Sequence, residues 1–357
     1  MEIKHVIING KYMAERMQGI VRYAREIVNE LDKIIDENMK VTLAIPSNSH
    51  DVPPFDNIEV VKLGKNKGII WEQTDLRRYI KKHKSSICLN LCNVAPLFVQ
   101  PGITAVLDVM YKANPTHYTT LHNRFSRMWH CLQYQYISRH EYKILTLSRF
   151  SKDEIEKYYP RSVGKTEIIP CSWQHVLTYK ESDEWHEKYP FLKENDYFFS
   201  LATLAKNKNG KWIIEIAKNN PEKVFAIAGN KYETEYDEIP SNVFMLKYVS
   251  DADACSLIRH CRAFIFPSIY EGFGLPPLEA LALGAEVVAS NCTSLPEVLG
   301  HSVHYINPYD VSVDLDELLK QPVESKDKVL EKYGWDRSAK RLYDIIAEAE
   351  HNFTECY

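Results

Sequence analysis

Short runs of β-branched and aliphatic residues alternate with longer segments of helical periodicity, and this alternation runs through the chain twice. The first series of strand-like runs comprises Ile3–Ile8, Val41–Ile45, Ile58–Leu63, Ile87–Leu91, Ile103–Val109 and Lys143–Leu147. The second comprises Tyr197–Leu201, Val224–Ala228, Val243–Leu246, Ala263–Phe266 and Glu286–Ala289. Such alternation builds parallel sheets covered by helices. We therefore predict an α/β protein with two Rossmann-like parallel-sheet domains, which face a cleft that suits a small-molecule site.

Length and composition narrow the class of protein further. The 357 residues accommodate two domains, which we place at residues 1–175 and 176–334, followed by a helix in 335–357. The net charge of −4 gives no reason to expect a nucleic-acid partner. No apolar run approaches the roughly 18–20 residues of a membrane span, and the N-terminus lacks the pattern of a signal peptide. The eight cysteines are scattered without a CxxC pair, so we expect free thiols and a cytoplasmic protein.

The most informative segment follows the strand-like run Ala263–Phe266. It reads Glu271-Gly272-Phe273-Gly274-Leu275-Pro276-Pro277-Leu278-Glu279-Ala280. The two prolines suit the first turn of a helix, so the glycines are predicted to lie in the loop before it. Backbone N–H groups at such a helix start favour an anionic phosphate, and Glu271 and Glu279 can accept hydrogen bonds from two sets of sugar hydroxyls. A ligand with phosphates between two sugars is a nucleotide-sugar. The alternative is a tight turn in which Glu279, placed in the first helical turn, only complements the helix dipole.

This segment resembles the signature of the retaining glycosyltransferases of family 4, which have the two-Rossmann fold called GT-B. The resemblance implies that Glu271 contacts the donor sugar and that Glu279 contacts the ribose of the nucleotide. It also implies that the intervening backbone contacts the diphosphate, through Gly272, Phe273, Gly274 and Leu275. The closing helix resembles the family's C-terminal helix, which can cross back to the N-terminal domain.

Two further segments of the second half resemble parts of the family's donor site. The loop after Tyr197–Leu201 contains Lys208, which matches the family lysine that faces the diphosphate. Asn207 stands where a second basic residue is common, and Lys206 is the candidate to compensate. Val249 resembles a residue that lines the nucleobase pocket. The Asp251-Ala252-Asp253 triplet has the form of a metal-binding motif, but its position at a helix start favours N-capping, and we expect neither a metal nor a cofactor.

In the first half, the resemblance implies that Gly19 begins the first helix close to the donor phosphate. Relatives often end the fifth strand with His-Asp, where this chain has Leu107 and Asp108. Asp108 is therefore the candidate to orient an acceptor hydroxyl, although it can equally bond to backbone. His117 is a candidate substitute for the missing histidine. A simple loop glycine is the alternative for Gly19.

Basic residues gather in two parts of the first half. They are Arg77, Arg78, Lys81, Lys82, His83, Lys84, Arg124, Arg127 and Arg139. A solvated helix face is the ordinary interpretation of such a run. Some family members use a basic, partly apolar face of the N-terminal domain to approach anionic membranes, so peripheral contact with the inner membrane is a second expectation.

The resemblance implies a metal-independent, retaining hexosyltransferase with Glu271, Lys208 and Asp108 as catalytic candidates. It further implies a UDP- or GDP-linked sugar as the donor. The implied acceptor is a hydroxyl of a glycan or lipid-linked glycan in surface polysaccharide biosynthesis. Two alternatives share the fold: a nucleotide-sugar 2-epimerase and a non-catalytic sugar- or nucleotide-binding subunit. An oxidoreductase is disfavoured because no Gly-x-Gly-x-x-Gly follows the first strand.

Overall fold

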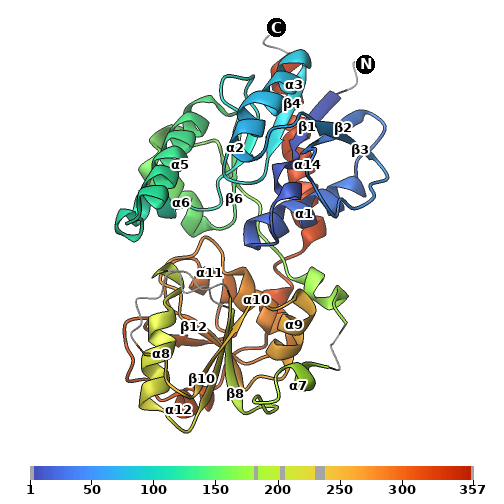
Figure 1. Cartoon of the computed structure of the whole chain (residues 1–357). Coiled ribbons are helices and arrows are strands. Elements are labelled where there is room, and N and C mark those ends of the chain that lie inside the picture. The colour runs from blue at the N-terminus through green and yellow to red at the C-terminus, as the bar shows by residue number, and fades with distance from the viewer. Residues whose placement is uncertain (1–3, 181–183, 202–205, 230–237, 355–357) are drawn as a thin grey trace. The chain divides into compact units, whose positions relative to one another are not determined.

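The computed structural model describes residues 4–180, 184–201, 206–229 and 238–354 (Figure 1). The chain forms two compact units. Unit 1 comprises Met1–Cys171 and Trp335–Tyr357, and unit 2 comprises Ser172–Gly334. Ile3, which we predicted to begin the first strand, and Ala202–Ala205, in the loop that contains Lys208, lie outside the described residues.

The sheet of unit 1, within the described residues, has seven parallel strands in the order β3-β2-β1-β4-β5-β6-β7. Their bounds are β1 (Lys4–Asn9), β2 (Met39–Pro46), β3 (Ile58–Leu63), β4 (Ser86–Asn90), β5 (Ile103–Ala105), β6 (Lys143–Thr146) and β7 (Thr166–Ile168). The chain moves outward from β1 to β3 and then returns to β4 on the other side of β1. The topological switch point of unit 1, where ligands bind in such sheets, therefore lies between β1 and β4.

Helices cover both faces of the unit 1 sheet. Their bounds are α1 (Gly19–Asp32), α2 (Gly68–Trp71), the π-helical η2 (Glu72–Leu76), α3 (Arg77–Lys82), α4 (Met110–Ala113), α5 (Leu121–His140), α6 (Arg149–Tyr158) and α14 (Trp335–Thr354). Trp71, Leu76 and Ile80 pack against β1, β2 and β4. Right-handed crossovers place α1 on the opposite face from α2–α3, because the chain changes direction at β3.

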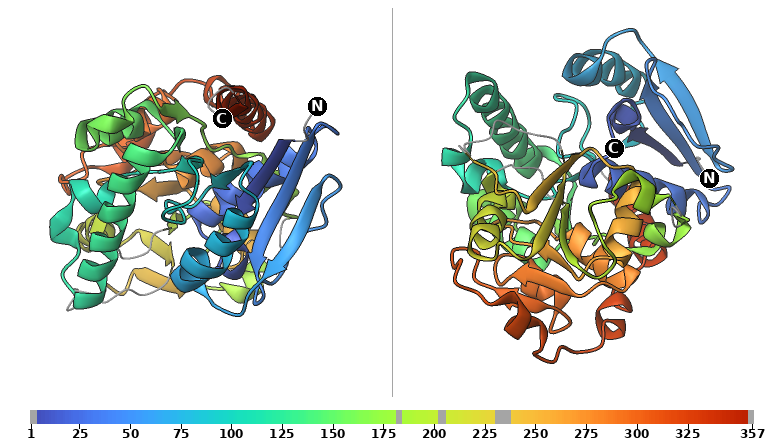
Figure 2. Two further views of the ribbon diagram at one scale, coloured as in Figure 1. Left: turned by 90° about the horizontal axis from the view of Figure 1, so that it is seen from above. Right: turned by 60° about the horizontal axis from the view of Figure 1, so that its bottom comes forward.

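The closing helix α14 packs beside α1 in unit 1 (Figure 2). The Tyr23 and Trp335 rings lie 6.4 Å apart, and Ser338 Oγ donates to the Pro170 carbonyl at 2.8 Å. Arg341 also donates to Glu167 at 3.0 Å. The last helix of the chain is thus part of the first unit, where it buries its apolar face.

Unit 2 contains, in its described part, a six-stranded parallel sheet with the order β10-β9-β8-β11-β12-β13. Its strands are β8 (Tyr197–Leu201), β9 (Val224–Ala228), β10 (Val243–Lys247), β11 (Ala263–Phe266), β12 (Val287–Ser290) and β13 (His304–Ile306). Its longer helices are α8 (Gly210–Asn219), α9 (Asp251–Arg259) and α10 (Leu275–Leu283), and its short ones are α7 (Trp185–Lys188), α11 (Leu295–Leu299), α12 (Leu315–Leu319) and α13 (Asp327–Leu330). The switch point of unit 2 lies between β8 and β11.

The predicted fold class of two parallel Rossmann-like sheets is confirmed. Some predicted bounds were wrong. The run Ile103–Val109 is a strand only to Ala105, because the Leu107 N–H bonds to the Asn93 side chain and the chain turns there. Helix α10 begins at Leu275, so Glu279 lies beyond the first turn in which we had placed it. The short strand β13 was missed.

Candidate functional site

Two loops meet at the switch point of unit 2, one after β8 and one after β11. The described part of the first loop ends in the 3-10 turn η6 (Lys206–Lys208). Lys208 Nζ donates to Glu271 Oε1 of the second loop at 2.6 Å, and it also lies 5.2 Å from the centre of the Phe266 ring. The side chains of Lys208 and Glu271 are 25% and 13% exposed, respectively. The structure therefore joins two of the predicted catalytic residues in a half-buried ion pair that a ligand can reach.

Asparagines beside Lys208 hold the two loops together. The Asn207 carbonyl accepts the Ile269 N–H at 2.8 Å, and its side-chain amide donates to the Tyr270 carbonyl at 3.4 Å. Asn209 has a φ of 54° and donates to the carbonyls of Pro267 and Pro308, at 3.1 and 2.7 Å. Asn207 thus fixes the loop that precedes Glu271. The role of Asn209 was not predicted, although an asparagine before a helix is typical of a left-handed turn.

The Gly-Phe-Gly segment leads directly into α10. Gly274 has a φ of 94°, and a Cβ atom there would lie 2.4 Å from Leu295 Cδ2, so a side chain at this position is strained. Phe273 is buried with its ring 5.2 Å from the Tyr333 ring. The helix leaves the N–H groups of Gly274 and Leu275 without intrahelical acceptors, since these are among its first four. This backbone can offer hydrogen bonds to an anion beside the Lys208 ammonium.

Glu279 lies one turn into α10 and contacts a residue that the sequence analysis missed. His175 Nε2 and Glu279 Oε1 are 2.8 Å apart, and their side chains are 4% and 14% exposed. His175 belongs to the 3-10 turn η5 (Gln174–Thr178) at the start of unit 2. A single histidine far from the motif carries no sequence signal for this contact.

The loop after β12 supports Glu271 from its other side. The Thr293 hydroxyl accepts the Glu271 N–H at 3.3 Å, and the Ser294 hydroxyl donates to the Glu271 carbonyl at 3.0 Å. Both residues belong to the segment Ala289–Val298, which resembles a family loop near the site. Glu271 is therefore held at its backbone by this loop and at its carboxylate by Lys208.

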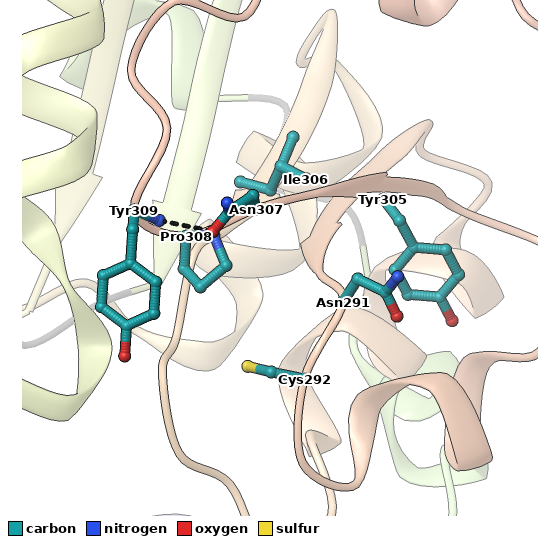
Figure 3. A pocket seen from close by; sticks show the side chains of 7 residues that line it. All are labelled: Asn291, Cys292, Tyr305, Ile306, Asn307, Pro308 and Tyr309. Atoms are coloured by element: carbon teal, nitrogen blue, oxygen red, sulfur yellow. Dashed lines mark hydrogen bonds between the residues drawn. The ribbon is translucent and has the colours of Figure 1, made fainter.

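A pocket of about 400 Å³ opens beside this loop, at the carboxyl ends of β12 and β13 (Figure 3). It is lined by Asn291, Cys292, Tyr305, Ile306, Asn307, Pro308 and Tyr309. Cys292 Sγ donates to the Ser268 carbonyl at 3.3 Å, which connects the pocket to the loop before Glu271. Burial raises the pKa of the Cys292 thiol, so this sulfur is protonated at neutral pH and is a poor nucleophile. Asn291 and Cys292 belong to the segment Ala289–Val298, whereas the other lining residues were not predicted.

Two other predicted residues of unit 2 are Lys206 and Val249. Lys206 is exposed in η6. Val249 is half-buried after β10, the edge strand of the sheet, two strands from β8.

The Asp251-Ala252-Asp253 triplet forms the first turn of α9. The triplet lies at a helix start, as predicted, and Ser250 caps the helix by accepting the Asp253 N–H at 3.1 Å. Lys188 pairs with the Asp253 carboxylate at 2.9 Å. Burial acts to raise the pKa of Asp253, but Lys188 and Ser250 outweigh it and hold this pKa below its ordinary value. Within the described ranges, no group of three or more histidine, cysteine or acidic residues is arranged to hold a metal ion.

The site residues that we predicted in unit 1 lie in the segments after strands β1 and β5. Gly19 is the first residue of α1, and an added Cβ atom would meet nothing within 4 Å. Asp108 Oδ1 accepts the Met110 N–H at 2.9 Å, so one carboxylate oxygen already has a backbone partner. Leu107 is buried, and His117 is half-buried in the turn η3 (Pro115–His117).

A buried polar network, which was not predicted, occupies the switch point of unit 1. Glu72 of η2 is fully buried, accepts from Asn9 Nδ2 at 2.6 Å and lies 3.6 Å from Lys11 Nζ. Asn9 Nδ2 also donates to Asn90 Oδ1 at 3.0 Å, across β1 and β4. Burial acts to lower the pKa of Lys11, but the carboxylates of Glu72 and Glu15 outweigh it, so this pKa is raised and the ammonium stays charged.

The two parallel Rossmann-like sheets assign the chain to the GT-B fold class. Solved structures share this fold over nearly the whole chain. Sucrose-phosphate synthase from Thermosynechococcus elongatus has a TM-score of 0.70 at 13% identity, covering 97% of this chain and 98% of that one. WaaG, a glycosyltransferase involved in lipopolysaccharide biosynthesis, has a TM-score of 0.64 at 14% identity, with the same coverage of 97% and 98%. Anabaena HepE, solved with UDP and glucose, has a TM-score of 0.62 at 14% identity and covers 99% of each chain.

Residues 181–335 match the family model described as glycosyl transferases group 1. The resemblance seen in the motif is thereby confirmed for this part of the chain. Among curated proteins, the serotype-specific mannosyltransferase WbdA of Escherichia coli is 39% identical over 190 residues, which are 47% of this chain and 23% of that protein. O-antigen chain mannosyltransferase B of Escherichia coli is 32% identical over 184 residues, which are 47% of this chain and 48% of that protein. The chain thus spans half or less of the length of these relatives.

None of the helices in the described ranges has both the length and the apolar character to cross a membrane.

Proposed function

We propose that this chain is a retaining glycosyltransferase that moves a sugar from a nucleotide-diphosphate donor to a hydroxyl of a glycan acceptor. The observation that carries the proposal is the Lys208–Glu271 pair at the switch point of unit 2, beside the start of α10. The match of residues 181–335 to a glycosyltransferase family supports it. The names of the curated relatives support mannose as the first sugar to test, and surface polysaccharide synthesis as the setting.

The donor would place its diphosphate between Lys208 and the backbone from Gly272 to Leu275. On binding, the Lys208 ammonium would turn from Glu271 to the diphosphate, and the freed Glu271 carboxylate would accept hydrogen bonds from the donor sugar. Glu279 would accept from the ribose hydroxyls, and Val249 would contact the nucleobase. Lys206 is close enough in sequence to add positive charge at the same loop.

The transfer would break the bond between the anomeric carbon and the diphosphate oxygen. The acceptor hydroxyl would form the new bond on the same face of the sugar, so that the anomeric configuration is retained, and its proton would pass to the departing diphosphate. Lys208 and the N–H groups at the start of α10 would stabilise the negative charge that grows on the leaving group. Gly19 and Asp108 of unit 1 are the proposed contacts to the donor phosphate and the acceptor hydroxyl. No metal step is included.

The test is release of nucleoside diphosphate from UDP-, GDP- and dTDP-linked sugars, mannose donors first, with EDTA present and with glycan acceptors added or omitted. We expect release from one donor, stimulated by acceptor and lost in Glu271→Ala. Conversion of the donor into an isomeric nucleotide-sugar without acceptor would indicate an epimerase instead. Donors that are neither bound nor altered would contradict the enzymatic proposal and favour a non-catalytic subunit.

A further inference from the structure

The pocket at the carboxyl ends of β12 and β13 contains none of the residues that we assign to the donor. Its volume of about 400 Å³ lies within the range of pockets that bind small molecules. Figure 3 shows the Tyr309 ring on one side of the pocket and the Asn291 amide on the other, with Cys292 between them. The carboxyl ends of parallel strands are where ligands bind in sheets of this kind. The pocket therefore has the position of a binding site.

The chemistry of the lining excludes several classes of ligand. None of its seven residues is a lysine, arginine, histidine, aspartate or glutamate. A phosphate or a carboxylate would find no cation there, and an ammonium group would find no anion. A wholly apolar ligand would cover the amides of Asn291 and Asn307 and leave them without hydrogen bonds. The lining therefore suits a neutral ligand that carries polar groups.

Two side-chain amides can contact such a ligand. Asn307 Oδ1 accepts the Tyr309 N–H at 3.0 Å, while Asn307 Nδ2 has no hydrogen-bond partner among the described residues. The Asn291 side chain is exposed, and in the described ranges its amide has no such partner either. An amide can donate to one hydroxyl and accept from the next, so this type of side chain matches the adjacent hydroxyls of a sugar.

Tyr309 supplies an apolar surface beside these amides. This residue is 78% exposed. A pyranose ring presents an apolar face of C–H bonds between its hydroxyl groups, and this face can pack against an aromatic ring. An exposed tyrosine alone is ordinary on a protein surface. A tyrosine that lines a pocket together with two amides has the combination of groups that a saccharide needs.

The walls of the pocket are fixed by hydrogen bonds of the protein itself. The Asn291 N–H donates to the Ile306 carbonyl at 2.9 Å, and Asn209 Nδ2 donates to the Pro308 carbonyl at 2.7 Å. Thr293, in the same loop as Asn291, has a φ of 53°, a left-handed conformation that is uncommon for a β-branched residue and gathers at functional sites. A pocket held in this way loses little conformational entropy when a ligand binds.

The same contacts connect the pocket with the Lys208–Glu271 pair. Asn209 follows Lys208 directly in the chain, and Cys292 Sγ donates to the Ser268 carbonyl in the loop before Glu271. A sugar in the pocket would therefore lie at the same edge of the sheet as a sugar held by Glu271.

We propose that this pocket is a saccharide subsite, which holds one sugar of the glycan acceptor by stacking on Tyr309 and by hydrogen bonds to Asn291 and Asn307. This inference rests on the proposed function, to which it adds an acceptor contact on unit 2. The transferred sugar of the donor has the same ring chemistry and is the alternative occupant. The acceptor is favoured because Lys208 and Glu271, the proposed donor contacts, do not line the pocket.

The first test measures the binding of trisaccharides of mannose, glucose, galactose and N-acetylglucosamine to the full chain by saturation-transfer NMR, without nucleotide. We expect at least one of them to bind, and its Kd to rise between about two- and tenfold in Tyr309→Ala and in Asn291→Ala. Tyr309→Phe, which keeps the ring, should bind nearly as well as the wild type. The matched control is Tyr248→Ala, because Tyr248 is 72% exposed and follows β10 at the opposite edge of the same sheet.

The second test separates the two occupants by the kinetics of sugar transfer. Tyr309→Ala should raise the KM for the glycan acceptor and leave unchanged both the KM for the donor and the affinity for nucleoside diphosphate. A rise in the KM for the donor alone would assign the pocket to the transferred sugar and overturn the proposal.

The outcomes also distinguish this inference from the proposed function. If no trisaccharide binds, or if Tyr309→Ala binds as well as the wild type, the subsite is wrong, although sugar transfer by the wild type would leave the proposed function intact. If a trisaccharide binds through Tyr309 but the chain alters no donor, the saccharide site stands and the proposed function is contradicted.

Discussion

The two switch points of this molecule contain the same pair of residue types in different surroundings. In unit 2, Lys208 and Glu271 are 2.6 Å apart, and their side chains are 25% and 13% exposed. In unit 1, Lys11 and Glu72 are 3.6 Å apart, with exposures of 11% and 0%. The pair of unit 1 also has amide partners, because Asn9 bonds to both Glu72 and Asn90.

The difference in burial indicates different roles for the two ion pairs: the fully buried pair supports the fold, whereas the partly exposed pair can bind a ligand. A buried ion pair is costly to break, since the remaining charge is left without water or a partner. A half-buried pair contributes little to stability and is free to exchange its partner for a ligand. We therefore expect loss of the unit 1 pair to lower the free energy of unfolding, and loss of the unit 2 pair to slow sugar transfer.

The largest effect on stability is expected from breaking the buried pair. Glu72→Ala leaves the Lys11 ammonium and the Asn9 amide without their partner and should lower the free energy of unfolding by about 3–5 kcal/mol. Urea denaturation followed by circular dichroism measures this loss. Glu72→Gln, which keeps an acceptor for Asn9, should lose less. A change below about 1 kcal/mol in Glu72→Ala would remove the contrast between the two pairs.

The accessible pair should show the opposite behaviour. Lys208→Ala should slow sugar transfer by roughly 10²–10³-fold, because a charge that stabilises the leaving diphosphate is lost. Its free energy of unfolding should change by no more than about 1 kcal/mol. Lys218→Ala is the matched control, since Lys218 pairs with Glu215 at 2.9 Å on α8 of the same unit. Comparable losses of activity in both variants would show that the position of Lys208 is not special.

A second buried carboxylate of unit 1, that of Glu141, should make the free energy of unfolding depend on pH. Burial raises the pKa of Glu141 to about 7, although the Gly102 N–H and the Thr104 hydroxyl oppose this rise. Because the folded state holds the proton more tightly than the unfolded chain does, this stabilisation is present at low pH and is lost as the pH rises through about 7. Relative to Glu141→Gln, the wild type should therefore lose up to about 3 kcal/mol of unfolding free energy between pH 5 and 8. If the free energies of unfolding of the wild type and of Glu141→Gln changed in parallel between pH 5 and 8, this prediction would be contradicted.

Substitutions at the two predicted glycines separate the effect of packing from the effect of ligand contact. Gly274→Ala forces a side chain into a left-handed conformation against Leu295 and should cost about 1–3 kcal/mol. Gly19→Ala meets open space, so its stability should be unchanged, while transfer should slow if a donor phosphate approaches this residue. Thermal denaturation together with transfer rates of both variants checks this. Loss of stability without loss of activity in Gly19→Ala would remove Gly19 from the proposed site.

The features that could be predicted from the sequence are those that depend on local patterns of residues. The alternation of strands and helices predicted both parallel sheets, and the motif around Glu271 indicated the family. The helix start at Asp251 was recognised because capping depends on neighbouring residues.

The contacts that were missed join residues far apart in the chain. Glu72 lies 63 residues from Asn9, and His175 lies 104 residues from Glu279. A single glutamate in a helical segment or a single histidine in a loop gives no pattern from which such a partner can be inferred. The two prolines were recognised as part of the first turn of α10, but the helix begins at Leu275, so Glu279 lies beyond that turn.

Calorimetric titration of UDP and GDP into the full chain tests most directly whether the switch point of unit 2 binds a nucleoside diphosphate. One of the two nucleotides should bind the wild type and Lys218→Ala equally well, and Lys208→Ala about tenfold or more weakly, because the lysine supplies a charge-assisted contact to the diphosphate. Absence of binding to the wild type, or equal binding to Lys208→Ala, would contradict the account.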